Sequence, residues 1–394
     1  MATGLRDDLM NVDAKAQARL IATRRELHER PEVSLHEEHT ADYIANYLDR
    51  LPVRNLKMRV GGHGVVTEVK GKLPGRSVLV RADIDGLPLE EATDLPFRSK
   101  NHGVMHACGH DVHMAIVLGL ADSLAVNQDR LPGMVRFAFQ PAEETAGGAK
   151  PMIEAGVLEG IDRVIGLHVW SQLPVGQVSV RSGAMMASAD WLTLTVGGQG
   201  GHGAQPDRAI DAVVIAAQVV TALQTLVSRE TSPHDPVVVT LGSIHGGSAF
   251  NIIAGEVVIQ GTLRTFDASL RERLLKRIDE LARGIAEAMR GRCEFRLESA
   301  APPVVNDPGV SKLVAEAIAG ALGDGAVVAH EPLMVGEDFA YFLEQRPGCF
   351  FLVGGAPEGP PVMHHTPQFR IDERCLPIGL KAMTAAVLRL VEPA

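Results

Sequence analysis

Apolar positions in the first half of the chain follow two patterns. Four nearly continuous apolar runs have the length and composition of buried strands: residues 65–69, 77–84, 134–139 and 163–169. Helical spacing of apolar side chains predicts two helices within residues 14–50, separated at Pro31, one helix over residues 110–126 and one from about residue 145. Strands that alternate with helices indicate an α/β fold whose central sheet is mostly parallel and flanked by helices.

The pattern changes after about residue 187. Residues 191–196 (WLTLTV) alternate between apolar and polar side chains, which is typical of a strand with one exposed face. The elements predicted next are a helix over residues 208–230, strands at 237–241 and 256–266, a helix over 269–290 and a strand at 293–297. Their order is that of a ferredoxin-like α+β domain. We therefore expect one α/β domain, residues 1–186 and 300–394, interrupted by an inserted domain at residues 187–299.

Composition narrows the class of protein. The 394-residue chain carries a formal net charge of −10, which argues against a nucleic-acid partner, and no uninterrupted apolar segment is long enough to suggest a membrane span. Its four cysteines include no C-x-x-C pair, and the N-terminus has no apolar secretory core. We therefore expect a cytoplasmic location and neither a nucleic-acid nor a membrane partner.

Histidines are concentrated in one short segment. Four of the 15 histidines fall within residues 102–113, where Cys108 and His110 are two positions apart in a loop that leads into a predicted helix. At this spacing a thiolate and an imidazole can bind one cation, and this pair of donors suits zinc, cobalt, nickel or manganese better than calcium or magnesium. His106 and His113 fit roles in the core or in support of the ligands equally well.

Acidic residues and one further histidine follow the predicted buried strands. Asp83 and Asp85 leave the end of one strand on the same face, at the edge where open α/β sheets bind ligands, although a polar turn explains them as well. Glu143 and Glu144 follow the next strand, so one carboxylate can bind a metal while the other acts as a general base, although such a pair is also common at a solvated helix N-terminus. His168 ends a further buried strand.

The number of candidate ligands favours two metal ions. Cys108, His110, Glu144 and His168, together with one histidine of the His364–His365 pair, make five protein ligands. A closed tetrahedral site uses four ligands, so a pair of ions that share a ligand fits this set better.

Four motifs, in order along the chain, resemble those of one enzyme family. They are residues 81–88 (RADIDGLP), 105–113 (MHACGHDVH), 140–144 (QPAEE) and 336–339 (GEDF). Over essentially its whole length the chain resembles the dinuclear metallo-amidohydrolases that include aminoacylase, carboxypeptidase G, hippurate hydrolase and the plant auxin-conjugate hydrolases. The CGHDVH form points to the hippurate and auxin-conjugate branch. The resemblance implies a zinc-exopeptidase-like catalytic domain and an inserted lid and dimerisation domain, hence a homodimer or a dimer-based tetramer.

The resemblance assigns a metal role to five residues. Cys108 would bridge two divalent ions (Zn, Mn, Co or Ni), and the remaining ligands would be His110, Glu144, His168 and His365. His365 is favoured over His364 because the last ligand of the family precedes a small hydroxyl residue and a proline, here Thr366 and Pro367.

The resemblance also assigns supporting roles near the metals. Glu143 would be the general base and Asp85 would orient a ligand. Asp83 stands where other branches of the family carry a ligand histidine, so the sequence leaves open whether it binds metal or only supports a ligand.

The inserted domain carries a glycine-rich loop, residues 198–203 (GQGGHG). It matches a dinucleotide-binding fingerprint, but the preceding strand alternates and Pro206 interrupts the loop, which argues against a nicotinamide-dependent oxidoreductase. The resemblance instead implies that His202 stabilises the oxyanion, and that Asn251 and Arg264 hold the free carboxylate of the substrate. Arg264 fits a surface charge equally well.

The predicted function is metal-dependent hydrolysis of the amide bond of N-acyl amino acids, in the manner of hippurate hydrolase, with N-aroyl or N-acetyl substrates. An N-acetyl-diaminopimelate deacetylase and an aminobenzoyl-glutamate or carboxypeptidase-type hydrolase are alternatives with the same motifs. A metal-binding or sensing protein without turnover is a further alternative, although the residues needed for turnover are all present.

Overall fold

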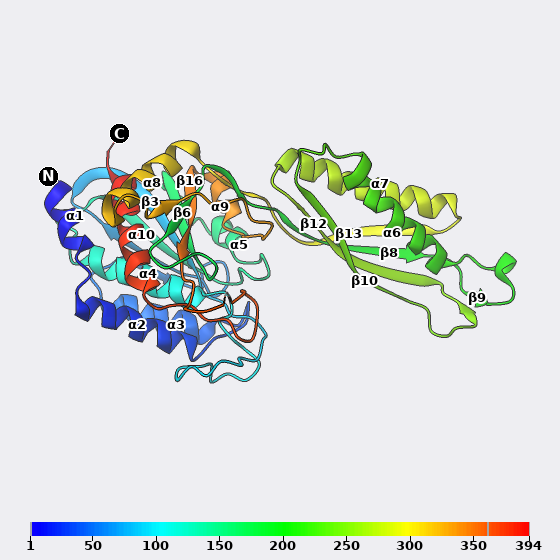
Figure 1. Cartoon of the computed structure of the whole chain (residues 1–394), viewed down its shortest axis with the longest axis horizontal. Coiled ribbons are helices and arrows are strands. Elements are labelled where there is room, and N and C mark those ends of the chain that lie inside the picture. The colour runs from blue at the N-terminus through cyan, green and yellow to red at the C-terminus, as the bar shows by residue number, and fades with distance from the viewer. Residues whose placement is uncertain (1, 361, 394) are drawn as a thin grey trace. The chain divides into compact units, whose positions relative to one another are not determined.

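The computed structural model describes residues 2–360 and 362–393, and the chain divides into two compact units. The first, called here the α/β unit, comprises the residues up to Gly183, Val305–Glu331 and the residues from Asp338 onward. The second, called here the insert, comprises Ala184–Val304 and Pro332–Glu337. Figure 1 shows the elements of both units.

The α/β unit is built on one eight-stranded sheet. In spatial order its strands are β1 (Arg54–Met58), β2 (Val65–Lys70), β4 (Pro132–Gln140), β3 (Leu73–Asp83), β5 (Arg163–Trp170), β16 (Gly348–Gly354), β6 (Val178–Val180) and β15 (Val327–Val328). The four central strands, β4, β3, β5 and β16, are parallel to one another, and antiparallel strands flank them. The predicted α/β fold with a mostly parallel sheet is confirmed. Of the four apolar runs, three form the parallel strands β3, β4 and β5, and the fourth forms the antiparallel strand β2.

Helices cover this sheet on both sides. The helices of the α/β unit are α1 (Ala2–Met10), α2 (Ala14–His28), α3 (Glu38–Asp49), α4 (His110–Ala125), α5 (Ala149–Glu154), α8 (Pro308–Leu322), α9 (Ala340–Gln345) and α10 (Cys375–Val391). One hydrophobic cluster joins α2, α3, α4, α8 and α10 to a face of the strands. Helix α4 lies deep in this layer, because almost all of its side chains are buried, and it therefore places its first residue, His110, in the protein interior.

One helix of this unit begins later than predicted. The helix expected from about residue 145 begins only at Ala149, because residues 142–147 form a tight turn in which Gly147 N–H donates to Ala142 O at 2.9 Å. Ala142 and Ala146 both have φ of +51° in this turn, a backbone conformation that no helix contains.

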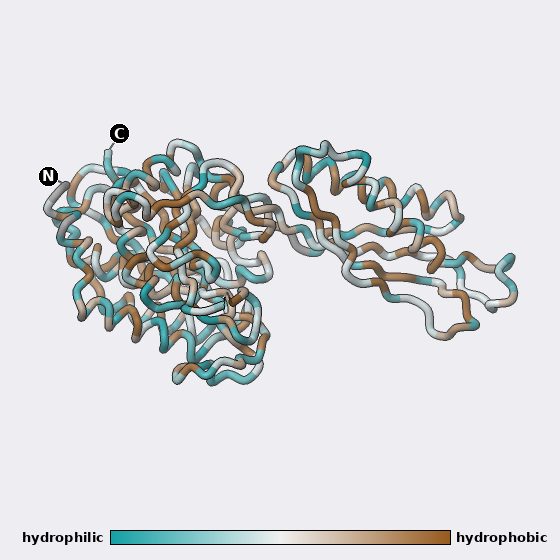
Figure 2. The backbone as a smooth tube through the Cα atoms, viewed as in Figure 1, coloured by the Kyte–Doolittle hydropathy of each residue, from teal (hydrophilic) through white to brown (hydrophobic). Residues whose placement is uncertain are grey.

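The insert has the ferredoxin-like arrangement. Its sheet has the spatial order β10 (Val237–Gly246), β12 (Glu256–Thr265), β8 (Ala189–Gly197) and β13 (Arg292–Ala301), with all neighbours antiparallel. Helices α6 (Ala212–Arg229) and α7 (Ala268–Ala288) pack on this sheet in one hydrophobic cluster. In β8, Leu192, Leu194 and Val196 are buried while Trp191 is exposed, as the alternating sequence predicts. Figure 2 shows that hydrophobic and hydrophilic positions also recur along the helices of the insert.

The observed bounds of the insert differ from the expected 187–299. Residues 300–304 and 332–337 belong to it, because β13 continues to Ala301 and because Leu333 exchanges backbone hydrogen bonds with Met185 and Ala187. The helix expected over residues 208–230 begins at Ala212, where the Asp211 side chain caps its first turn. The remaining short elements are β7 (Gly183–Met186), β9 (Gly201–His202), a 3₁₀ turn (Pro206–Arg208), β11 (Ile252–Ile253) and β14 (Val304–Asn306).

Helix α6 is, among the described residues, the one helix with the length and composition of a membrane span. Its side chains at Ala212, Ile215, Val219, Leu223 and Leu226 are buried against the sheet of the insert, so this apolar stripe has a partner within the fold.

Candidate metal centre

The loop before α4 places two predicted ligands side by side. Gly109 caps the helix with φ of +94°, and a Cβ at this position would lie 2.4 Å from Cγ1 of Val169 on β5. Only glycine combines this backbone conformation with such a close approach to β5. The glycine therefore brings Cys108 and His110 against the carboxyl end of β5, where His168 lies.

Two groups of donor atoms share the Cys108 thiol. Cys108, His110 and His168 form one group, and Cys108, Glu144 and His365 form the other, with the donor atoms of each group within 4.8 Å of one another. Cys108 Sγ lies 3.3 Å from Nε2 of His168 and 3.4 Å from Nε2 of His365. His365 Nε2 lies 3.4 Å from a carboxylate oxygen of Glu144. The structure thus brings all five predicted metal ligands together, with Cys108 between the two groups.

The chemistry of these donors fits a pair of divalent cations. His110 Nε2 and Glu144 Oε1 are buried and have no hydrogen-bond partner among the described residues, so both are available to a cation. The other ring nitrogen of His110, Nδ1, lies 2.9 Å from the backbone oxygen of Asp85. A hydrogen bond at Nδ1 is the usual way to direct Nε2 of a histidine toward a metal.

Burial and neighbouring charges shift the pKa values of the donors strongly. Burial raises the pKa of the Cys108 thiol well above its usual value, and the carboxylates of Glu144 and Glu143 raise it further. Burial and the neighbouring imidazole of His113 hold the pKa of His168 well below its usual range. A thiolate in so acidic a setting needs a cation beside it, and a neutral His168 has a lone pair to donate.

Burial alone lowers the pKa of His110, but the carboxylates of Asp83 and Asp85 outweigh it and raise that pKa to about 10. In the absence of metal ions, His110 is therefore protonated. Metal binding at His110 requires the release of this proton.

Asp85 and Asp83 have different surroundings. The Asp85 carboxylate accepts hydrogen bonds from the Ser34 hydroxyl at 2.7 Å and from the Glu144 backbone N–H at 3.1 Å. Asp83 is bound by the Arg81 guanidinium at 2.5 Å and by Nδ1 of His113 at 2.6 Å. Asp85 thus contacts the segments that carry two donors, whereas Asp83 belongs to neither group that contains Cys108.

The two C-terminal histidines point to different partners. His364 stacks on Trp170 with ring centroids 4.6 Å apart, and its ring nitrogens contact the Val169 carbonyl and the Ser171 hydroxyl. His365 has φ of +60°, and its ring joins Cys108 and Glu144. The geometry therefore favours His365 as the ligand.

Of the other histidines of the sequence cluster, His113 and His106 are buried in the core and His102 is exposed. Nε2 of His113 accepts the Val169 backbone N–H at 2.8 Å, while its Nδ1 contacts Asp83. His106 is buried, and burial lowers its pKa to about 4.

Buried charges behind the centre were not predicted from the sequence. Arg24 and His28 on α2 contact Asp111, the second residue of α4, at 2.6 and 2.9 Å. Both side chains lie on the same face of α2 as Leu20 and Leu27. The sequence could have indicated this buried pair, because two polar residues four positions apart stand within an apolar stripe.

The motif near residue 338 also lies in the interior. Arg81 donates to Asp338 at 3.0 Å, and the side-chain amide of Gln140 donates to both Asp338 oxygens. Burial, only partly offset by Arg81, raises the pKa of Asp338 to about 6. These contacts tie the carboxyl ends of β3 and β4 to the segment before α9.

Glu143, the predicted base, lies beside the donors and is mostly buried. One of its carboxylate oxygens is 3.9 Å from Nε2 of His110, and the same distance separates His110 from a Glu144 oxygen. Both glutamates therefore direct their carboxylates to the same side of His110.

The predicted residues of the insert lie at two places. Strand β9 carries His202 and pairs with β11, and the Asn251 carbonyl accepts the backbone N–H of Gly203 at 2.9 Å. Arg264 lies on β12, eight residues beyond Glu256, and donates to the Met334 carbonyl at 3.1 Å. Within the insert, Arg264 is thus at the end of β12 away from the pair formed by β9 and β11, and it is half-buried rather than a free surface charge.

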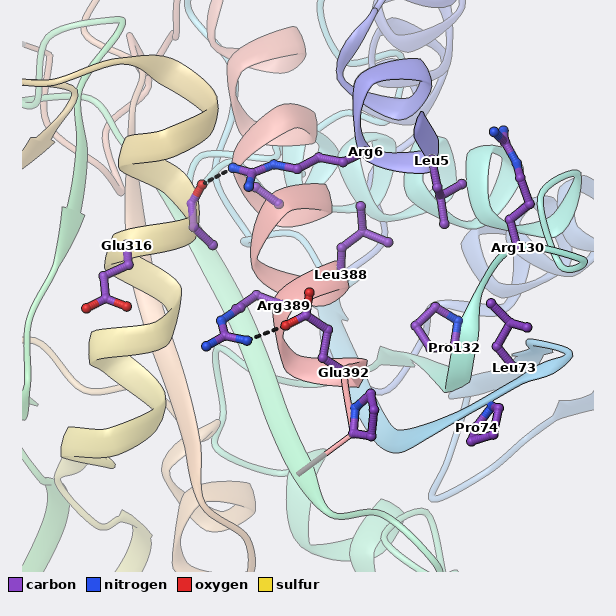
Figure 3. A pocket seen from close by; sticks show the side chains of 13 residues that line it. Leu5, Arg6, Leu73, Pro74, Arg130, Pro132, Glu316, Leu388, Arg389 and Glu392 are labelled. Atoms are coloured by element: carbon purple, nitrogen blue, oxygen red, sulfur yellow. Dashed lines mark hydrogen bonds and ion pairs between the residues drawn. The ribbon is translucent and has the colours of Figure 1, made fainter. Parts of the chain in front are cut away.

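A cavity of about 480 Å³ lies elsewhere in the α/β unit (Figure 3). Its walls come from α1, α8, α10 and the amino ends of β3 and β4, and Leu5, Leu73 and Leu388 face it. None of the predicted metal ligands lines this cavity, because the ligands lie at or beyond the opposite, carboxyl ends of the strands.

Comparison with known proteins identifies the family. The model of peptidase family M20/M25/M40 matches residues 79–389, and the chain therefore belongs to this family. The chain is thus a hydrolase, as the motifs predicted.

Two curated relatives and one solved structure show how close the similarity is. An N-acetyl-L-cysteine deacetylase of Bacillus subtilis (strain 168) is 41% identical over 362 residues, which cover 91% of this chain and 85% of the relative. An N-acyl-L-amino acid amidohydrolase of Geobacillus stearothermophilus is 42% identical over 302 residues, 76% of this chain and 81% of the relative. The YXEP protein of Bacillus subtilis, described as a dinuclear metal-binding peptidase of family M20, has a TM-score of 0.84 and 34% identity, with coverage of 97% of this chain and 100% of that one. The predicted pair of metal ions agrees with that description and with the two donor groups that share Cys108.

Proposed function

We propose that this chain hydrolyses the amide bond of N-acyl amino acids and releases a carboxylic acid and a free amino acid. The observation that carries the proposal is the pair of donor groups joined by Cys108, with the Glu143 carboxylate beside them. The names of the two curated relatives, a deacetylase and an amidohydrolase, support this substrate class.

Five residues would hold two divalent ions: Cys108, His110 and His168 on one side, and Cys108, Glu144 and His365 on the other. When bound, such ions polarise the amide carbonyl and lower the pKa of a water molecule. Zinc, manganese, cobalt and nickel all suit a set of thiolate, imidazole and carboxylate ligands.

The chain's own residues would then move the protons. Glu143 accepts a proton from the attacking water, and the water oxygen forms a bond to the carbonyl carbon. Glu143 next gives this proton to the amide nitrogen as the carbon–nitrogen bond breaks, so the amino acid leaves as a neutral amine. Asp85 keeps His110 and the Glu144 backbone in place through the hydrogen bonds described above.

Residues of the insert would complete the chemistry. His202 would donate a hydrogen bond to the oxyanion, a contribution that is typically worth about 10²–10³ in rate. Asn251 and Arg264 lie toward opposite ends of β12 within one chain, so in the proposed dimer they would hold the free carboxylate of one amino acid from different copies of the chain. The half-buried position of Arg264 agrees with a cation kept for an anionic partner. Within the substrate class we propose N-aroyl and N-acetyl amino acids, with hippurate as the reference compound.

The insert would also form a homodimer. The solvent-facing positions of α6 carry no charge before its last residue, Arg229, and Val213 and Val214 near its start are 48% and 47% exposed. The outer edge of the sheet, β10, exposes Ile244 as well. An uncharged, partly apolar helix face next to an open strand edge favours a second copy of the chain as its partner.

A cytoplasmic location stays a prediction.

The direct test is a panel of N-acyl amino acids in which the acyl group and the amino acid vary separately. The panel includes hippurate, N-acetyl amino acids, N-acetyl-diaminopimelate and aminobenzoyl-glutamate, and the released amine is measured. We expect turnover to disappear after removal of metal with EDTA and to return with Mn, Co, Ni or Zn to different degrees. Hydrolysis that survives complete chelation, or a metal-loaded chain that cleaves no member of the panel, would refute the proposal.

A further inference from the structure

The residue before the proposed base has an unfavourable backbone conformation. Ala142 is fully buried and has φ of +51°, in the left-handed region that side chains with a Cβ rarely adopt. It directly precedes Glu143 and Glu144, so its backbone angles set the direction in which both glutamates leave the chain.

A buried carboxylate from a distant segment contacts this residue. Glu37 is fully buried between α2 and α3, and its Oε1 accepts the backbone N–H of Ala142 at 2.8 Å. The same oxygen accepts the N–H of Leu35 at 3.0 Å, and Leu35 also has a left-handed conformation, with φ of +70°. One carboxylate oxygen therefore joins two left-handed residues that are more than a hundred positions apart in the chain.

The segment that carries Glu37 is itself anchored on both sides. Glu32 caps α3 by accepting the N–H and the hydroxyl of Thr40 at 2.8 and 2.9 Å, and its own backbone carbonyl accepts the Gly86 N–H at 2.7 Å. Ser34 donates to the Asp85 carboxylate, which in turn accepts the Glu144 N–H. These contacts hold the segment that carries Glu37 in place. The carbonyl of Ala142 is held as well, because it accepts a hydrogen bond from the Gly147 N–H.

We propose that Glu37 is a positioning residue for Glu143: its carboxylate holds Ala142 in the left-handed conformation and so directs the base at the metal-binding side chains. The inference rests on the proposed role of Glu143. Glu37 itself touches neither the donors nor the substrate in this account, and it acts only through the backbone of Ala142.

Two conservative substitutions separate the effect of the length of the Glu37 side chain from the effect of its charge. Glu37→Gln keeps the length, and its amide oxygen can accept both N–H groups, while the new NH₂ replaces an oxygen that has no hydrogen-bond partner among the described residues. Glu37→Asp keeps the charge but is one methylene too short for Ala142. We expect kcat to fall about 10²-fold in Glu37→Asp and less than about tenfold in Glu37→Gln, as for a misplaced catalytic group.

A third substitution tests whether the backbone of Ala142 carries the effect. Glycine adopts positive φ without the penalty of a Cβ, so Ala142→Gly should restore part of the lost kcat when it is combined with Glu37→Asp. Glu32→Asp is a graded control: it weakens the cap of α3 that helps to anchor this segment but leaves the Glu37 carboxylate in place, so it should lower the melting temperature with a smaller fall in kcat than Glu37→Asp.

The measurements are kcat, KM and metal content of each variant, together with hydrogen exchange at the Ala142 amide. Faster exchange at Ala142 in Glu37→Asp, a loss in kcat with metal content unchanged and rescue by Ala142→Gly support the proposal. Unchanged exchange, a larger kcat loss in Glu37→Gln than in Glu37→Asp, or joint loss of metal and kcat would overturn it. Exchange needs no substrate, so this test stands even if the wild-type chain hydrolyses none of the panel, a result that counts against the proposed function instead.

Discussion

At the scale of single residues, the Cys108 thiol has surroundings that strongly disfavour its ionised form in the absence of a cation. It belongs to both donor groups and lies among carboxylates that, with burial, raise its pKa well above the usual value. Metal ions bound at the two donor groups would stabilise the thiolate, and Cys108 would then be a ligand of both proposed ions.

This position predicts different metal losses for two ligand substitutions. Cys108→Ala removes a donor from both groups and should leave the chain with less than one bound ion, whereas His365→Ala leaves Cys108, His110 and His168 intact and should retain about one of the two ions of a dinuclear site. Metal content after gel filtration, measured by plasma mass spectrometry, distinguishes the variants. Two ions retained by Cys108→Ala would show that the thiol does not bridge them.

The sequence predicted the metal ligands because their residue types are unusual where they stand. A histidine at the end of a buried strand, or a cysteine two positions from a histidine, seldom serves packing alone, and the structure brings these residues together. Arg24, His28 and Glu37 were not predicted, because their partners Asp111 and Ala142 are 83 or more positions away in the chain. Nothing in the local pattern specifies such a distant partner.

At the scale of elements, the start of α4 depends on one glycine. Gly109 combines φ of +94° with a close approach to Val169, and Gly103, in the loop before it, has φ of +75° but no neighbour within 4 Å of a Cβ. Both glycines have a positive φ that a residue with a Cβ rarely adopts, but only Gly109 is packed against a neighbouring side chain.

These two glycines form a matched pair for substitution. Gly109→Ala should lower the melting temperature and the metal content, because it adds a steric conflict with β5 to a backbone cost of about 1–3 kcal/mol. Gly103→Ala should carry only the backbone cost and keep its metal. Calorimetric melting curves and metal content test this, and a Gly109→Ala chain that binds metal like the wild type would contradict the account of the loop.

Hydrophobic periodicity predicted the helices and strands that bury an apolar face. It failed where polar contacts determine the backbone conformation. Strand β1 was not predicted because most of its side chains are exposed and it contains no apolar run. The predicted helix began about four residues too early, at residue 145, because the turn over residues 142–147 contains two left-handed alanines, and a distant carboxylate binds the first of them, Ala142. The order of strands and helices sufficed for the class of both units, but it did not predict the strand order of the eight-stranded sheet.

At the scale of the whole molecule, the two helices of the insert present different surfaces. The exposed positions of α6 carry one charge, at its last residue Arg229, whereas α7 exposes several charged side chains along its length, among them Lys276, Arg283 and Glu280. An interface between copies of the chain should therefore involve α6.

Light scattering coupled to gel filtration tests this interface. We expect the wild-type chain to be a dimer and Val214→Lys to be a monomer, because the substitution would place an unpaired charge within an apolar contact. Lys276→Glu on α7 is the control and should leave the dimer intact. A wild-type chain that is monomeric at all concentrations would contradict the proposed assembly.

The central claim is that Glu143 acts as the base of a metal-dependent amide hydrolase. Its most direct test is the turnover of an N-acyl amino acid by Glu143→Gln, with the bound metal counted in the same sample. The account predicts an unchanged metal content and a kcat lowered by about 10²–10⁴-fold, since glutamine keeps the shape but cannot accept the proton. A Glu143→Gln chain that binds its metal and hydrolyses the substrate at close to the wild-type rate would contradict it.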